Sequence, residues 1–278
     1  MTISRIMRDL LCVLGLTLAA GSVYAQAKPA AAEYKPEVGQ AGKDVVWVPT
    51  SQVLVDKMLD MAKVTPSDYV IDLGSGDGRT VITAAKRGVR ALGIEYNPDM
   101  VQLSKENAAK EGVSDKATFM KADIFESDFS KASVITMFLL PDINLKLRPK
   151  ILNLKPGTRI VSNSFTMGDW EDDDTATANT NGDCSYWCIA HMWIVPAKVE
   201  GTWQFGGGKV TLKQTYQMLS GSLESGGQTT AVTGKMRGDQ ISLKAGAAEY
   251  SGRVNGNAIE GTVKTGSQSG KWAANRGR

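Results

Sequence analysis

From about residue 45 onward, short apolar runs alternate with longer segments in which apolar residues recur at helical spacing. The runs predict strands, at residues 69–72, 91–95, 117–120, 133–140, 159–165 and 188–196. The longer segments predict helices, after Thr50 and at residues 80–87, 98–112 and 145–154. Thr50 has a side chain suited to cap the first helix. The alternation predicts an α/β fold, with a doubly wound, mostly parallel sheet over residues 45–197.

Beyond residue 197 the helical periodicity stops, and the pattern becomes one of short strands. Polar turns separate seven alternating runs, at residues 209–214, 217–223, 229–236, 240–243, 249–254, 258–263 and 270–273. Such short, closely spaced runs predict an antiparallel meander, closed as a small barrel or packed as a sandwich. We therefore expect a small antiparallel all-β domain over residues 198–278. Within it four glycines suggest a loosely repeated hairpin: Gly221, Gly234, Gly252 and Gly261.

The first 25 residues have the pattern of a signal peptide. Arg5 and Arg8 precede an apolar stretch at residues 10–20, and Val23-Tyr24-Ala25 fits a small-x-small cleavage site. The stretch is too short for a permanent membrane span, so we expect cleavage after Ala25 and export to the periplasm or the medium. An uncleaved anchor is the alternative. Residues 26–44, rich in Ala, Pro and Lys, are interpreted as a flexible linker.

Composition and charge narrow the classes of function. The chain has 278 residues, of which 42% are hydrophobic and 22% charged, as in a globular protein of one or two domains. Its net charge is +3 and no long Lys/Arg cluster is visible, so nothing points strongly to nucleic acid. After signal cleavage two cysteines remain, Cys184 and Cys188. A disulfide, free buried thiols and a metal or redox pair all stay open.

The most informative segment follows the first predicted strand. Asp72 is followed by glycines at alternate positions, Gly74, Gly76 and Gly78, and a helix begins directly after them. Such a turn lets a ligand lie against the backbone at the carboxyl end of a parallel strand. The spacing is not the G-x-G-x-x-G of dinucleotide enzymes, and a carboxylate at Asp72 would repel a pyrophosphate while attracting an ammonium group. A nicotinamide-dependent oxidoreductase is therefore disfavoured.

Two further acids end the next two predicted strands. Glu95 ends the second strand, where a carboxylate can accept hydrogen bonds from both hydroxyls of a ribose. Asp123 follows the third strand, with apolar Ile124 beside it. The glycine segment resembles motif I of class I methyltransferases that use S-adenosylmethionine (SAM), and Asp123 resembles the family residue that meets the adenine amino group. The alternative interpretation treats these acids as ordinary strand-end caps.

A closer resemblance covers residues 46–195. Val48-Pro49-Thr50, Asp72-Leu73-Gly74-Ser75-Gly76-Asp77-Gly78-Arg79 and Gly93-Ile94-Glu95-Tyr96-Asn97-Pro98 are similar to the seven-strand protein-lysine methyltransferases. That group includes mitochondrial enzymes acting on the ATP synthase c-subunit and the adenine nucleotide translocator, as well as bacterial relatives. The resemblance implies a Rossmann-like methyltransferase sheet with SAM as cofactor. The residues expected to bind SAM are Thr50, Asp72, Gly74, Ser75, Gly76, Gly78, Glu95, Tyr96, Asp123 and Ile124.

The acceptor side is expected after the fourth strand. Leu140 and Pro141 are expected to contact the substrate, and Asp142 to orient an amine, with a helix N-cap as its alternative role. The Asn/Asp-Pro-Pro-aromatic motif of some base methyltransferases is absent here, which argues against a DNA base. We expect methyl transfer to an acceptor, with protein lysine as the candidate. The alternative is an exported non-catalytic protein of the same fold whose β domain recognises an envelope partner.

Three other features have structural interpretations. His191 lies in an apolar run and is expected to be a structural histidine rather than a base. The acidic run at residues 170–174 is interpreted as a solvated loop, with attraction of a lysine-bearing substrate as the alternative. Trp187, Trp193 and Trp203 are expected in the core or between domains rather than around a ligand.

Overall fold

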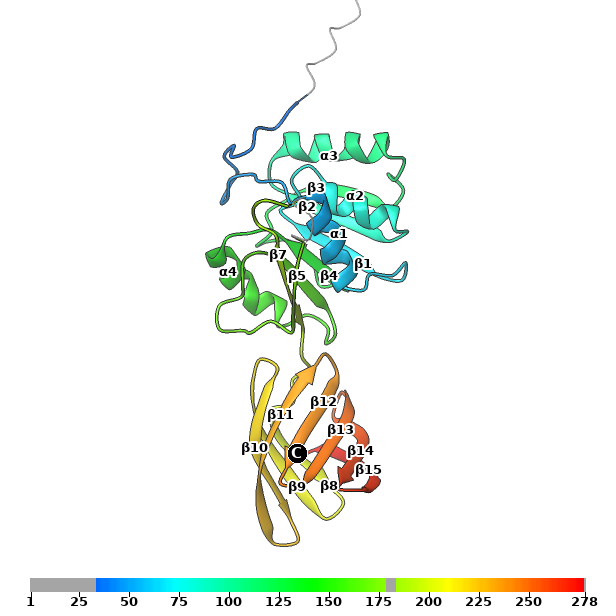
Figure 1. The fold of residues 1–278 in the computed structure, drawn as a ribbon, viewed down its shortest axis with the longest axis vertical. Helices are drawn as coiled ribbons and strands as arrows, with labels where there is room; N and C mark the ends of the chain where they lie inside the picture. Colours follow the sequence, from blue (N-terminus) through cyan, green and yellow to red (C-terminus); the bar gives the residue numbers. More distant parts are fainter. Residues whose placement is uncertain (1–33, 179–183, 278) are drawn as a thin grey trace, which may run out of the picture. The chain divides into compact units, whose positions relative to one another are not determined.

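The computed structural model describes residues 34–178 and 184–277 (Figure 1). A seven-stranded sheet has the order β3-β2-β1-β4-β5-β7-β6. The bounds are β1 (Tyr69–Leu73), β2 (Arg90–Glu95), β3 (Ala117–Lys121), β4 (Val134–Met137), β5 (Arg159–Asn163), β6 (Asp174–Thr177) and β7 (Ile189–Ile194). The first five are parallel, while β7 runs antiparallel to both β5 and β6. The predicted mostly parallel, doubly wound sheet is confirmed.

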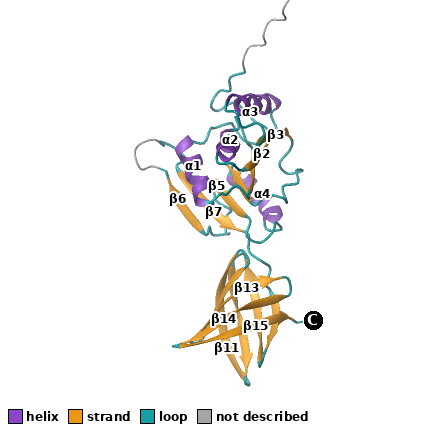
Figure 2. Ribbon diagram, turned by 90° about the vertical axis from the view of Figure 1, so that its right-hand side faces the viewer, coloured by secondary structure: helices purple, strands orange, loops and turns teal. Residues whose placement is uncertain are grey.

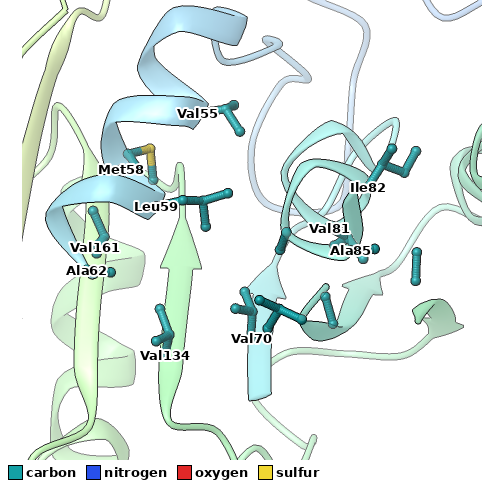
Figure 3. Close-up of a cluster of buried hydrophobic side chains, with 14 of the residues drawn as sticks. Val55, Met58, Leu59, Ala62, Val70, Val81, Ile82, Ala85, Val134 and Val161 are labelled. Carbon is teal, nitrogen blue, oxygen red and sulfur yellow. The ribbon is translucent and has the colours of Figure 1, made fainter. Parts of the chain in front are cut away.

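The helices cover both faces of this sheet. Those described are α1 (Gln52–Met61), α2 (Arg79–Lys86), α3 (Pro98–Lys110) and α4 (Pro141–Ile151). One hydrophobic cluster places α1, α2 and α3 against one face, and a second places α4 against the other. Figure 3 shows Met58 and Leu59 of α1 near Val134, and Val81 of α2 near Val70. Alternate residues of each strand therefore enter opposite clusters, as buried parallel strands require.

Two helix starts differ from the prediction. Ser51 rather than Thr50 caps α1, with its hydroxyl accepting a hydrogen bond from the Leu54 N–H. Helix α4 begins at Pro141, four residues earlier than expected, because proline has no N–H to satisfy and suits the first helical turn. Pro149 lies inside α4, exposed and near its end. The short antiparallel β6 was not predicted, because its sequence Asp-Thr-Ala-Thr lacks an apolar run.

The C-terminal strands form a closed antiparallel barrel (Figure 2). Its strands are β8 (Gly201–Phe205), β9 (Gly208–Thr215), β10 (Met218–Ser225), β11 (Gln228–Arg237), β12 (Gln240–Ala245), β13 (Ala248–Asn255), β14 (Ala258–Thr265) and β15 (Gln268–Arg276). Strand β8 was not predicted; it pairs with β9 and with β15 and so closes the barrel. The expected small antiparallel all-β fold is confirmed, and of barrel or sandwich the structure shows a barrel. The boundary near residue 198 stays a prediction.

The acidic run at residues 170–174 is not a solvated loop. Trp170 is fully buried, and the buried Asp173 carboxylate bonds the Ile194 N–H and pairs with Lys235 of β11 at 3.0 Å. Asp172 accepts from His191 at 2.7 Å, so that histidine has a structural partner, as predicted. Among the described residues no helix is long and apolar enough to cross a membrane.

Candidate active site

A cavity of about 240 Å³ opens at the carboxyl ends of β1, β2, β3 and β4. The strand order reverses direction between β1 and β4, and open α/β sheets bind ligands at such a switch point. The sequence-predicted residues that line the cavity are Thr50, Asp72, Gly74, Ser75, Gly76, Glu95, Tyr96, Asp123, Ile124 and Leu140. The sheet topology thus brings together residues that lie far apart in the sequence.

The glycine turn after β1 fits tightly against β2. The N–H groups of Gly74 and Ser75 both donate to the Ile94 carbonyl, at 2.9 and 3.1 Å. Gly93 has no side chain, and a Cβ there would lie 2.5 Å from the Ser75 hydroxyl oxygen. Gly76 has φ +54°, and a Cβ there would lie 2.6 Å from the Trp47 indole nitrogen. Glycine is therefore required both for the turn and for the close approach of its neighbours.

Glu95 connects the turn to the start of α3. One carboxylate oxygen accepts from the Gly76 N–H at 2.9 Å, and the other accepts from the N–H groups of Tyr96 and Asn97 at 2.8 and 2.9 Å. These three bonds fix the carboxylate at the cavity edge. Each oxygen keeps acceptor capacity, because a carboxylate has about four lone-pair sites. Glu95 is thus oriented to receive a diol such as that of a ribose.

Asp72 is the buried charge of the cavity. Sheet register places it beside Gly93 on one side and Thr136 on the other, and the Thr136 hydroxyl donates to its carboxylate at 2.6 Å. Burial raises the pKa of Asp72 to about 7; the charges of Glu95 and Asp77 add to the increase, while the Thr136 hydrogen bond opposes it. A cation brought into the cavity would favour the ionised form. The site is therefore suited to an ammonium group.

An orphaned polar atom lies beside Asp72. The Ser75 hydroxyl oxygen is buried and has no hydrogen-bond partner among the described residues. A buried hydroxyl without a partner is costly, so a ligand that bonds it gains affinity. Together with Asp72 and Glu95, this hydroxyl fits the amino-acid tail and ribose of SAM. Bound there, SAM supplies a methyl group already activated by its sulfonium.

Asp123 and Tyr96 lie at the third strand end. The Lys43 ammonium bonds the Asp123 carboxylate at 2.5 Å, and the Phe125 N–H donates to it at 2.9 Å. The Lys43 hydrogen bond is the main reason that the pKa of Asp123 lies below its ordinary value. Lys43 also lies over the Tyr96 ring, 5.2 Å from the centroid. The predicted role of Asp123 at an adenine amino group stays a prediction.

Residues 34–48 cross the cavity and correct the linker interpretation for residues 34–44. Backbone bonds join Gly39 to Trp47 and Trp47 to Gln40, at 2.8 and 2.9 Å, and an isolated bridge pairs Ala41 with Val46. Lys43 and Trp47 both line the cavity. Sequence reasoning missed this segment because its composition resembles that of a flexible linker. The alternation in Val45-Val46-Trp47-Val48 was the available signal.

Three predicted site residues do not line the cavity. Gly78 is the N-cap of α2 with φ +83°. Pro141 and Asp142 lie exposed in the first turn of α4. Asp142 therefore has no contact with the cavity in this structure, and its catalytic role stays a prediction. Leu140, just before them, does line the cavity and is 45% exposed.

The acceptor end contains aromatic residues that sequence reasoning did not assign. Phe138, Phe165 and Trp187 all line the cavity. Trp187 had been expected in the core or between domains, but it is 48% exposed and lies at the cavity, whereas Trp193 and Trp203 are fully buried. The prediction for Trp187 was wrong because no local pattern distinguishes a tryptophan in a loop over a cavity from one in a core.

Comparison with known proteins agrees with this geometry. Residues 72–174 match the family described as the ANTKMT methyltransferase domain. A protein-lysine N-methyltransferase of Saccharolobus islandicus is 46% identical over 129 residues, which cover 45% of this chain and 80% of that protein. The human lysine N-methyltransferase of the ATP synthase c-subunit is 34% identical over 128 residues, covering 46% of this chain and only 54% of its own length.

A solved structure supports the cofactor. An RNA methyltransferase from Salinibacter ruber, crystallised with S-adenosyl-L-homocysteine, is 42% identical, with a TM-score of 0.50 over 55% of this chain and 96% of that one. Because that complex and the archaeal relative agree with the site described here, the chain belongs to the family of SAM-dependent methyltransferases that includes the Saccharolobus islandicus enzyme.

Proposed function

We propose that the chain transfers the methyl group of SAM to the ε-amine of lysine in a protein. The names of the relatives support this substrate, since the archaeal and human proteins are both lysine N-methyltransferases. The resemblance of the glycine turn to lysine methyltransferases agrees with it.

The observation that carries the proposal is the character of the acceptor end. Its walls are apolar or aromatic, with Leu139, Leu140 and Ile143 between the rings. Methyl transfer is an in-line displacement that needs an uncharged amine, and apolar surroundings disfavour the ammonium form of lysine. Such walls also hold the aliphatic part of the side chain without hydrogen bonds. Positioning and desolvation are then the main tasks of the protein.

RNA is a second candidate acceptor, because the relative from Salinibacter ruber is described as an RNA methyltransferase. The net charge of +3 and the absence of a long basic cluster in the sequence argue against it. Among the described residues of the acceptor walls named above, side-chain groups that could read a base edge are also few.

One experiment tests the acceptor class. The chain from Gln26 is incubated with tritium-methyl SAM and, separately, with total protein and total RNA from the source cells. Labelled protein that yields methyl-lysine on hydrolysis would support the proposal, and label confined to RNA would overturn it. The variant Glu95→Ala is the control, because loss of the ribose acceptor should abolish labelling of either substrate.

We also propose that the protein acts after export, with its first 25 residues removed. The charge and apolar pattern of residues 1–25 supports this, although that segment lies outside the described residues. The disulfide between Cys184 and Cys188 also supports it, since disulfides persist in oxidising compartments. The periplasm or the medium is the expected location.

A further inference from the structure

Three aromatic rings meet at the acceptor end from three separate parts of the sheet. Phe138 directly follows β4, Phe165 follows β5, and Trp187 precedes β7. The ring centroids are 6.0 Å apart for Phe138 and Phe165, 6.0 Å for Phe138 and Trp187, and 5.3 Å for Phe165 and Trp187. All three rings line the cavity that holds Asp72 and Glu95. Aromatic pairs at these separations attract one another and keep each other in place.

The loop that carries Trp187 is closed at its base. Cys184 and Cys188 form a disulfide with a Cα–Cα distance of 5.8 Å, and Cys184 is buried. Backbone bonds join Ala178 to Cys188 and Ser164 to Ile189, so the base of the loop is also fixed to the sheet. Between the cysteines, Tyr186 is 82% exposed, while the next residue lies at the cavity.

The backbone of Trp187 is unusual. Its φ is +58°, a conformation that a bulky side chain rarely adopts. Such outliers persist only where the surrounding structure imposes them, and they concentrate at functional sites. The short disulfide-closed loop is the element that imposes it here. The strained residue is also the one whose ring completes the aromatic group.

We infer that Phe138, Phe165 and Trp187 form the wall that selects the lysine side chain of the acceptor, and that the Cys184–Cys188 disulfide holds Trp187 in this wall. The inference rests on the proposed function. Aromatic faces attract an ammonium or methylammonium group, and they pack against methylene carbons. Rings could also stack on a base, but the two phenylalanines offer no polar atom to a base edge. Lysine is therefore the acceptor that this wall fits better.

The test compares variants of the chain from Gln26 in methyl transfer to total protein, with methyl-lysine as the product measured. Trp187→Ala should raise the half-saturating protein concentration about tenfold, while the dissociation constant for SAM changes less than about twofold. Trp187→Phe should recover most of the loss. Tyr186→Ala, in the same loop but exposed, is the matched control and should behave as the unmodified protein. The double variant Cys184→Ser/Cys188→Ser should reproduce the acceptor defect without a change in SAM binding.

A small cation probes the same wall directly. n-Butylammonium mimics the end of a lysine side chain and should inhibit methyl transfer competitively with the protein acceptor, several-fold less effectively for Trp187→Ala. Methyl-lysine formation that is equal in the unmodified protein and Trp187→Ala would overturn the inference while leaving the proposed function intact. Weakened SAM binding in Trp187→Ala would also overturn it, because the ring would then belong to the cofactor site. Methylation of RNA alone would overturn the proposed function and the inference with it.

Discussion

Asp72 is the residue at which folding and cofactor binding make opposite demands. A carboxylate in a fully buried position raises the free energy of the folded state when it ionises, and only one hydroxyl, that of Thr136, bonds it. The same charge is what an ammonium group of the cofactor needs. The residue therefore lowers stability in the absence of SAM and contributes affinity in its presence.

The stability of the SAM-free protein should depend on pH through this residue. The folded-state pKa of about 7 lies above the ordinary value of 3.8, so the favourable contribution of the protonated form is complete below about pH 4 and is lost as pH rises through 7. Asp72→Asn should therefore gain stability relative to the unmodified protein as pH rises from 5 to 8.5, by at most about 4 kcal/mol. Urea unfolding at both pH values measures this. A difference independent of pH would contradict the raised pKa.

Cofactor binding should show the reverse dependence. Below about pH 7 Asp72 holds a proton in the free protein, and binding of an ammonium group must displace it. SAM affinity of the unmodified protein should fall as pH drops from 8 to 6, by up to about tenfold per unit below the pKa. Asp72→Asn should bind SAM more weakly and with little change over that range. Calorimetric titration measures both, and parallel pH profiles would exclude Asp72 as the partner of the ammonium group.

At the scale of elements, the glycine segment was predictable because each of its constraints is local. The turn, the acid before it and the acid ending β2 all lie within one α/β unit. Strands β6 and β8 were missed because pairing, rather than an apolar run, defines them. The aromatic wall was missed because Phe138, Phe165 and Trp187 come together only through the sheet order.

The glycine in β2 gives a prediction at this scale. A Cβ at Gly93 would lie within 2.7 Å of the Ser75 side chain and of the Phe119 ring, so the turn or the ring must shift. Gly93→Ala should lower the free energy of unfolding by about 1–3 kcal/mol, the usual cost of overpacking. SAM affinity should fall as well, because Ser75 belongs to the cavity.

Gly270→Ala is the matched control for that substitution. It makes the same chemical change in a strand, and the nearest atom to the added Cβ lies at 3.9 Å. Its stability should match that of the unmodified protein within about 1 kcal/mol, with SAM affinity unchanged. Equal effects of the two substitutions, measured by urea unfolding and calorimetry, would show that backbone entropy rather than crowding at Ser75 is responsible.

The barrel glycines show what a sequence pattern can and cannot reveal. Gly221 and Gly261 suggested a repeated hairpin, and the structure explains the repeat by crowding between strands. A Cβ at either position would lie 1.9 Å from a carbonyl oxygen of the neighbouring strand. Glycines in strands are typical of points where another backbone approaches closely, as where a sheet bends to close. The pattern predicted hairpins, but the extra strand that closes the barrel had no pattern of its own.

At the scale of the whole molecule, export and the acceptor wall depend on the same bond. The sequence has three cysteines, of which Cys12 lies in the predicted signal peptide. The other two form the disulfide that closes the Trp187 loop. In a reducing compartment that bond would be open, and the loop would lose the covalent closure at its base. The proposed location therefore supplies the condition that the proposed acceptor site requires.

Thiol counting on protein from the source cells tests this link. If the first 25 residues are removed and the disulfide forms, the denatured chain should begin at Gln26 and offer no reactive thiol before reduction, and two afterwards. One reactive thiol before reduction would mean that Cys12 is retained, as in an uncleaved anchor. Two would mean that the chain is processed but its loop is open. Because methyl transfer by each form can be measured beside its thiol count, the same sample shows whether the closed loop accompanies activity toward lysine.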